Sequence, residues 1–382
     1  MNQTAYFDYA AATPLLPEAL AAMQPYFTDI FYNPSAMNVS ARAVKYDIQA
    51  ARATVARAIG AKPNEIIFTA GGTEANNLAI MGCMQQYTDA HVVTTSIEHE
   101  SVLQPAHLYD QTIVPVDTQG RVNTRVLTQA ITDNTVVVSI ILANNEIGTI
   151  QDIKEITTAV TQIKAQRHKA GNTRPIYVHT DACQAVNYLD INTTRLGIDM
   201  MTINAGKIYG PKQTGALFVK SSVPLRPIIY GGGHERSLRS GTQNVANIIG
   251  FAKAIETVRQ DVTTEVKRLE YLQRHIIENL VDGATIQLNG ARVGRRLANN
   301  IHLTINGYDN ERLLMELDER GVQIATGSAC SASSDAPSHV LAAIGLSDAQ
   351  TRNSVRITCG RYTTIEHCNL LIYSIKEVVA KH

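Results

Sequence analysis

Three short segments contain residue types that could take part together in one reaction, in which the protein forms a covalent bond to a bound group. Lys207 follows an apolar run and lies between glycines, which suits a Schiff-base lysine, although a surface lysine is the common alternative. Asp181 follows another apolar run, where a carboxylate either meets a ligand or caps a helix. Gly71-Gly72-Thr73 predicts a tight turn into a helix, whose free N–H groups either bind a phosphate or only begin the helix.

Together, the three segments favour a pyridoxal phosphate site. This cofactor needs a lysine for its Schiff base, an acid that keeps its ring nitrogen protonated, and a cradle for its phosphate. All three segments are expected at the carboxyl ends of strands in one sheet, the edge at which such sheets bind ligands. The glycines match neither the dinucleotide fingerprint GxGxxG nor the nucleotide-phosphate loop GxxxxGK[ST].

The elements that must position these residues alternate between strands and helices from about residue 40 to 220. A helix with apolar residues at helical spacing is expected to end at Gly60. This alternation predicts a mostly parallel sheet with helices on both faces. The expected strands cover residues 65–69, 91–96, 112–116, 136–143, 176–179, 200–204 and 215–220.

The pattern changes after Gly250. Apolar residues three or four apart from Phe251 to Leu280 predict one long amphipathic helix. We therefore predict an α/β fold with a large domain over residues 13–255 and a smaller α+β domain formed by residues 1–12 and 256–382. Within the smaller domain we expect strands at 300–305 and 354–358 and short helices at 311–319 and 338–344.

The composition excludes several classes of protein. Lys plus Arg and Asp plus Glu both total 34, so the chain lacks the basic surplus of a nucleic-acid binder. Its longest mostly apolar run, residues 135–143, is much shorter than the roughly 20 residues of a membrane-spanning helix. The five cysteines match no zinc site or disulfide framework, and we see no secretion signal. We expect a cytoplasmic protein with free thiols and no metal site.

The chain resembles the cysteine desulfurases, which are pyridoxal phosphate enzymes of fold type I in the class-V aminotransferase group. The similarity is strongest to the branch that supplies iron–sulfur assembly, and it extends from Phe7 to Thr364. It implies that the large domain binds the cofactor and that the small domain carries the Cys330 loop. The matching segments are residues 7–14, 33–35, 72–79, 98–99, 144–148, 207–212, 231–236, 239–242, 327–330 and 361–364.

The resemblance implies a role for each matching residue. Lys207 would hold the cofactor and shuttle the α-proton of the substrate, Asp181 would pair with the ring nitrogen, and His99 would stack on the ring. Asn145 and Arg356 would hold the substrate carboxylate, which suits the planar fork of a guanidinium. The other cofactor contacts would come from Gly72, Thr73, Asn145, Gln184, Asn204 and, from the neighbouring subunit of a homodimer, Thr242.

Cys330 lies among Gly, Ser and Ala residues, whereas structural cysteines lie among bulky apolar groups. A flexible, exposed loop suits a nucleophile that must present its cargo elsewhere. The resemblance implies that Cys330 attacks the sulfur of bound L-cysteine and becomes a persulfide. The sulfur would then pass to an acceptor such as an iron–sulfur scaffold or a tRNA-thiolation protein. We interpret the other cysteines as packing residues: Cys83, Cys183, Cys359 and Cys368.

One segment departs from the family pattern. The family usually has Ser-x-His before the lysine, whereas this chain has Asn204-Ala205-Gly206. The Asn204 amide can still donate a hydrogen bond, but Gly206 offers only its backbone.

The resulting hypothesis is an L-cysteine desulfurase that releases L-alanine. One alternative is another class-V enzyme, such as a selenocysteine lyase or a small-amino-acid transaminase, although a transaminase has no use for the Cys330 nucleophile. The other alternative is a non-catalytic sulfur-relay partner. It is disfavoured because Lys207, Asp181, Gln184 and Cys330 are all retained.

Overall fold

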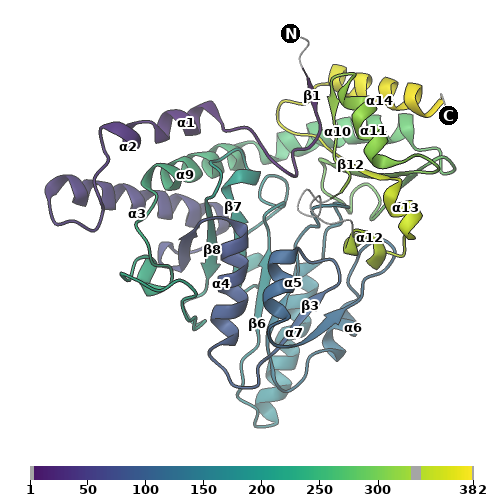
Figure 1. Ribbon diagram of the computed structural model, residues 1–382. Coiled ribbons are helices and arrows are strands. Elements are labelled where there is room, and N and C mark those ends of the chain that lie inside the picture. Colours follow the sequence, from purple (N-terminus) through teal and green to yellow (C-terminus); the bar gives the residue numbers. More distant parts are fainter. Residues whose placement is uncertain (1–3, 328–336, 381–382) are drawn as a thin grey trace.

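The computed structural model describes residues 4–327 and 337–380, which are arranged around a seven-stranded sheet (Figure 1). The strand order is β2-β8-β7-β6-β5-β3-β4, and every pair is parallel except the two that β8 makes with β2 and β7. The predicted mostly parallel sheet is confirmed. Its strands are β2 (Ile66–Thr69), β3 (His91–Thr95), β4 (Asp110–Val114), β5 (Thr135–Ser139), β6 (Tyr177–Asp181), β7 (Met200–Asn204) and β8 (Gly215–Val219).

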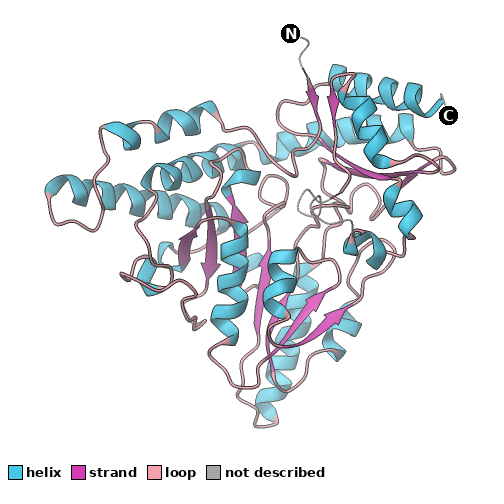
Figure 2. Ribbon diagram, viewed as in Figure 1, coloured by secondary structure: helices cyan, strands magenta, loops and turns pink. Residues whose placement is uncertain are grey.

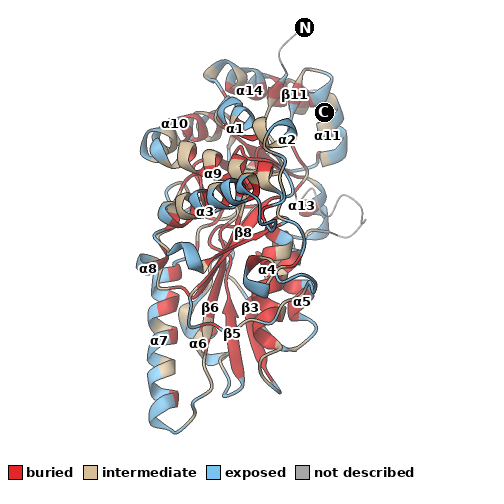
Figure 3. Ribbon diagram, turned by 90° about the vertical axis from the view of Figure 1, so that its left-hand side faces the viewer, coloured by how far each residue is buried: buried red, intermediate tan, exposed pale blue. Residues whose placement is uncertain are grey.

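Helices cover both faces of this sheet. Val92 and Val137 pack on the face that α4 covers, and their neighbours Val93 and Val138 pack on the opposite face with α3, α7 and α9. Figure 3 shows the buried strands between α4 and α5 on one side and α7 on the other. The helices of this part are α1 (Pro17–Met23), α2 (Pro25–Thr28), α3 (Val39–Ile59), α4 (Gly72–Met84), α5 (Glu100–Ala106), α6 (Thr124–Gln129), α7 (Ile153–Lys169), α8 (Thr193–Leu196) and α9 (Val245–Gln260).

A smaller antiparallel sheet, in the order β12-β10-β9, is formed by the C-terminal third of the chain. Helices lie beside it (Figure 2). No helix in the described residues is long and apolar enough to cross a membrane. The elements of this part are α10 (Val262–Leu280), β9 (Ile286–Leu288), β10 (Asn300–Ile305), α11 (Asn310–Asp318), β11 (Val322–Gln323), α12 (His339–Ala343), α13 (Asp348–Arg352), β12 (Ser354–Thr358) and α14 (Ile365–Ala380).

The N-terminal segment packs with this C-terminal part. Strand β1 (Ala5–Tyr6) pairs in parallel with β11, and the Phe7 carbonyl accepts a hydrogen bond from the backbone N–H of Thr358, the last residue of β12. Figure 1 shows β1 beside α14, far from α3. These contacts favour grouping residues 1–12 with the C-terminal unit, but the division into domains at residues 12 and 255 stays a prediction.

The single helix expected over residues 251–280 is wrong. The structure has two helices, because Asp261 leaves helical geometry with φ −114° and ψ 15°. Helix α9 packs against α1 and α3, whereas α10 packs against α14, so the two helices serve different hydrophobic cores. The apolar spacing continues across Asp261, and therefore the pattern could not indicate the break. The helix expected to end at Gly60 does end there, with φ 68°.

Candidate active site

A cavity of 220 Å³ lies at the carboxyl ends of β3, β6 and β7, beside the N-terminus of α4. This is the edge at which parallel sheets bind ligands. The residues predicted from the sequence that line it are Gly72, Thr73, His99, Asn145, Asp181, Gln184, Asn204, Lys207 and Arg356. The lining also includes residues that the sequence did not indicate: Ala10, Ala11, Asn76, Ser101, Ile141 and Cys183.

One predicted site residue that the structure describes is not part of this lining. Thr242 is exposed on the loop before α9. Cys330 lies outside the described residues.

Asp181 is the last residue of β6, and its carboxylate is buried. Its Oδ2 accepts a hydrogen bond of 2.7 Å from Asn76 Nδ2, and its Oδ1 accepts one of 2.9 Å from the backbone N–H of Cys183. Both carboxylate oxygens are thus held in place by N–H donors. Asp181 can therefore present a fixed negative charge to a cation in the cavity.

Lys207 ends a short 3-10 turn that follows β7 directly. Its Nζ donates to the carbonyl oxygens of Ala10 at 2.8 Å and Ala11 at 2.7 Å. The Ala10 carbonyl also accepts from Gln184 Nε2 at 2.9 Å. Backbone carbonyls of the N-terminal segment thus hold the side chains of Lys207 and Gln184. Every residue has a backbone carbonyl, so these two contacts could not be predicted from the sequence.

The N-terminus of α4 offers space and donors for an anion. Gly71, just before the helix, has φ 137°, a value that other residues rarely adopt. A Cβ atom at position 72 would lie 2.8 Å from Cys183 Sγ and 3.5 Å from Asn204 Nδ2. The Asn204 Oδ1 accepts from the Gly206 N–H at 3.0 Å, so the amide NH₂ is on the side of Gly72. Asn204 therefore presents a donor beside the helix N-terminus, despite the departure from Ser-x-His.

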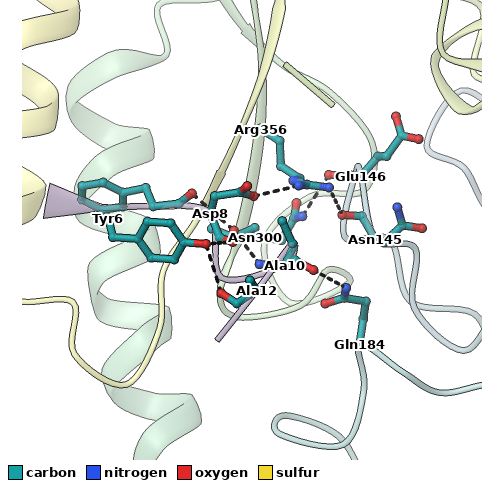
Figure 4. Close-up of polar contacts among 12 residues, drawn as sticks. Tyr6, Asp8, Ala10, Ala12, Asn145, Glu146, Gln184, Asn300 and Arg356 are labelled. Atoms are coloured by element: carbon teal, nitrogen blue, oxygen red, sulfur yellow. Dashed lines mark hydrogen bonds and ion pairs between the residues drawn. The ribbon is translucent and has the colours of Figure 1, made fainter. Parts of the chain in front are cut away.

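Arg356 comes from β12 and is 2% exposed. Its guanidinium lies between Asp8 and Asn145 (Figure 4). Nη2 pairs with Asp8 Oδ1 at 2.7 Å, and Nη1 donates to the Asn145 carbonyl at 3.2 Å. Its buried Nε has no hydrogen-bond partner in the described part of the chain. A carboxylate bound at this wall of the cavity would meet a guanidinium that is already held in one orientation.

Cys183 corrects one sequence-based interpretation. It is partly exposed and lines the cavity, whereas Cys83, Cys359 and Cys368 are buried packing residues as predicted. Burial raises the pKa of the Cys183 thiol well above its usual range, and the adjacent Asp181 charge raises it further. The thiol therefore stays protonated near neutral pH and is a poor nucleophile.

Comparison with known proteins identifies the family. The sequence pattern described as aminotransferase class-V matches residues 5–371. The chain belongs to this family. Class-V aminotransferases depend on pyridoxal phosphate.

The class-V relatives that the chain resembles over its whole length are named cysteine desulfurases. It is 40% identical to "Cysteine desulfurase IscS" of Dictyoglomus turgidum, with 100% of this chain and 96% of the relative covered. It is 38% identical to the protein of the same name from Methanosarcina thermophila, with 100% and 93% covered.

Solved structures of the same type share the fold. One described as a NifS-like protein superposes with a TM-score of 0.91 at 28% identity and covers both chains completely. Another, described as SspA in complex with cysteine, has a TM-score of 0.80 at 34% identity and covers 94% of this chain and 99% of its own.

The residues of this class-V cavity fit the family cofactor. Asp181 offers a buried carboxylate to a protonated ring nitrogen, and Lys207 offers an amine. The missing side chain at Gly72 leaves room at the N-terminus of α4, where backbone N–H groups and the Asn204 amide can bind a phosphate.

Proposed function

We propose that this chain is an L-cysteine desulfurase that uses pyridoxal phosphate and forms a persulfide on Cys330. The proposal is carried by one observation: the Lys207 amine and the Asp181 carboxylate line the same cavity at the start of α4. Similarity over the full chain to relatives named cysteine desulfurases supports the choice of substrate.

Bound pyridoxal phosphate supplies an electron sink for a carbanion at the substrate α-carbon. Asp181 keeps positive charge on the ring nitrogen, and the α4 N-terminus, Thr73 and Asn204 hold the phosphate. Gln184 donates to the ring hydroxyl while its amide is steadied by the Ala10 carbonyl. Lys207 holds the group and moves the proton at the α-carbon.

Arg356 and Asn145 bind the carboxylate of the substrate. The Asp8 pair fixes the guanidinium before substrate arrives, and therefore little side-chain entropy is lost on binding. The solved structure described as SspA in complex with cysteine supports cysteine as the ligand.

Sulfur transfer conserves atoms and electrons with no outside oxidant. Cys330, as a thiolate, attacks the substrate sulfur, the C–S bond breaks, and an S–S bond forms. The carbon that loses sulfur takes up a proton, so cysteine plus one thiol becomes alanine plus one persulfide. The raised pKa of Cys183 makes it unsuited to this attack.

A homodimer and a sulfur acceptor complete the proposal. Thr242 is exposed away from the cavity of its own chain, which leaves it available to the phosphate of a partner subunit. Exposed apolar side chains around α2 and the start of α3 support an interface between copies. The acceptor is an iron–sulfur scaffold or a tRNA-thiolation protein, and the site of action is the cytoplasm.

The test is release of alanine from L-cysteine by the cofactor-loaded protein with a thiol reductant. We expect alanine from the wild type and from Cys183→Ala, and little from Cys330→Ala. No alanine from the wild type despite bound cofactor would contradict the desulfurase. Alanine from L-selenocysteine alone would support a selenocysteine lyase instead.

A further inference from the structure

A chain of hydrogen bonds joins His99 to Asp181 through two side chains that sequence reasoning did not select. Asn76 Nδ2 lies 2.7 Å from Asp181 Oδ2 and 2.8 Å from Ser101 Oγ. Ser101 Oγ lies 2.8 Å from His99 Nδ1, and the Ser101 backbone N–H donates to the same nitrogen at 3.0 Å. Asn76, Ser101 and Asp181 are at most 7% exposed, and the two contacts to His99 are partly buried.

The direction of each bond follows from chemistry. An ionised carboxylate only accepts, so the Asn76 amide must turn its NH₂ group to Asp181. The second hydrogen of that NH₂ group then goes to Ser101 Oγ, which must accept it. The single Ser101 hydroxyl hydrogen is left to donate to His99 Nδ1.

His99 Nδ1 also accepts a second hydrogen bond, whose direction is fixed by its donor. A backbone N–H can only donate, and that of Ser101 points at His99 Nδ1. His99 Nδ1 therefore receives two hydrogen bonds and carries no hydrogen itself. A neutral imidazole bears one hydrogen, which must lie on Nε2.

The Asn76 amide uses only its donors in this chain of hydrogen bonds. Its Oδ1 is buried and has no hydrogen-bond partner in the part of the chain described, as is also the case for the Oδ1 atoms of Asn187, Asn299 and Asn300. The position thus retains an unpaired acceptor, normally unfavourable, while using both amide hydrogens along this chain.

We propose that Asn76 and Ser101 are positioning residues that fix His99 as the neutral tautomer with its proton on Nε2. His99 then acts on the substrate side as a proton donor, while Lys207 takes the α-proton. The same chain of hydrogen bonds connects His99 to Asp181, whose carboxylate faces the ring nitrogen. This inference rests on the proposed function for its purpose, although the tautomer can be measured without activity.

The test is the ¹⁵N NMR spectrum of histidine side chains in the cofactor-loaded protein near neutral pH. The chain has 11 histidines, and His99→Gln identifies the signal of His99 by its loss. We expect a protonated Nε2 and an unprotonated Nδ1. A wild-type spectrum with the proton on Nδ1 would overturn the proposal.

Two matched pairs of variants separate positioning from packing. Ser101→Ala should raise the share of His99 with a proton on Nδ1 about two- to tenfold, the effect of one lost hydrogen bond, and Ser101→Thr should restore it. Asn76→Leu should shift His99 in the same direction. Asn77→Leu should not, because Asn77 Nδ2 donates only to the backbone carbonyls of Thr73 at 2.9 Å and Ser101 at 3.5 Å and does not reach the Ser101 hydroxyl. An unchanged His99 signal in both Ser101→Ala and Asn76→Leu contradicts the proposal.

Failure of this inference differs from failure of the proposed function. If the wild type releases alanine but His99 carries its proton on Nδ1, only the tautomer assignment is wrong. If no alanine forms, the desulfurase proposal fails, and the spectrum still decides whether Asn76 and Ser101 set the tautomer.

Discussion

Gly72 illustrates how one missing side chain shapes the cofactor site. A Cβ atom there would lie 2.8 Å from Cys183 Sγ, closer than such atoms approach in folded proteins. We predict that Gly72→Ala weakens pyridoxal phosphate binding by at least about tenfold, or ~1.4 kcal/mol, measured by cofactor titration of the apoprotein.

The neighbouring thiol provides the control. Cys183→Ala removes the atom that the new methyl group would strike, so the double variant should regain part of the affinity. Equal affinity of Gly72→Ala and wild type would show that the space at position 72 is not used.

Glu98, the residue before His99, should make stability depend on pH. Its carboxyl is fully buried, Oε1 accepts from Thr95 Oγ1 and the Ile141 N–H, and Oε2 has no partner in the described residues. Burial raises its pKa from 4.5 to about 8. The folded protein therefore binds this proton more tightly than the unfolded chain does, and the free energy of unfolding falls as the pH rises through that range.

Glu98→Gln removes this titration and keeps an acceptor at Oε1. Relative to the variant, the wild type should lose a few kcal/mol of unfolding free energy between about pH 4.5 and pH 8, at about 1.4 kcal/mol per pKa unit. Urea unfolding of the cofactor-loaded proteins across that range measures the difference. Parallel curves for the two proteins would contradict a raised pKa.

Residues with unusual chemistry after a predicted strand could be found from the sequence. Lys207 and Asp181 were found in this way, and they do line one cavity. The Ala10 carbonyl and Asn76 could not be found, because a backbone group and a neutral helix residue acquire a role only through distant contacts.

At the scale of elements, the N-terminal segment links two sheets. Strand β1 pairs with β11, and the next residues reach the cavity, where they meet Arg356 and Lys207. The Tyr6 hydroxyl stabilises this turn by sharing its one hydrogen between the carbonyl oxygens of Asp8 at 2.8 Å and Ala12 at 3.1 Å (Figure 4).

Tyr6→Phe removes this shared hydrogen bond and should lower the free energy of unfolding by about 1 kcal/mol. The control is Tyr373→Phe, which loses only an exposed bond to Glu377 and should change stability little. Denaturant midpoints measured for both variants test this. Equal midpoints would mean that this shared hydrogen bond adds nothing.

Regular elements were more predictable than their breaks. Alternating apolar runs located the strands of the main sheet to within a few residues, although β5 ends at Ser139 and not at residue 143. The break at Asp261 left no mark on the apolar pattern, because helices on both sides of it need the same spacing.

At the scale of the whole molecule, residues from distant parts of the chain line one cavity. The main sheet supplies Asp181 and Lys207, the small sheet supplies Arg356, and the N-terminal segment supplies the carbonyls between them. If Thr242 serves the partner subunit, each site also needs a second chain.

Mixed dimers test that requirement. A dimer of one Lys207→Ala chain and one Thr242→Ala chain would contain one site with both residues intact if Thr242 acts across the interface. We predict that it binds one cofactor with wild-type affinity and has about half the wild-type alanine output per dimer, as one site of two remains. If the mixed dimer requires as high a cofactor concentration for half-saturation as the Thr242→Ala homodimer, Thr242 does not act in trans.

The most direct test of the central claim is to locate the sulfur after reaction. The cofactor-loaded protein is given L-cysteine without reductant, its alanine is counted, and its peptides are weighed by mass spectrometry. The desulfurase proposal predicts one added sulfur atom on the Cys330 peptide for each alanine released in the first turnover. Alanine with no added sulfur on Cys330, or with the sulfur on Cys183, would contradict it.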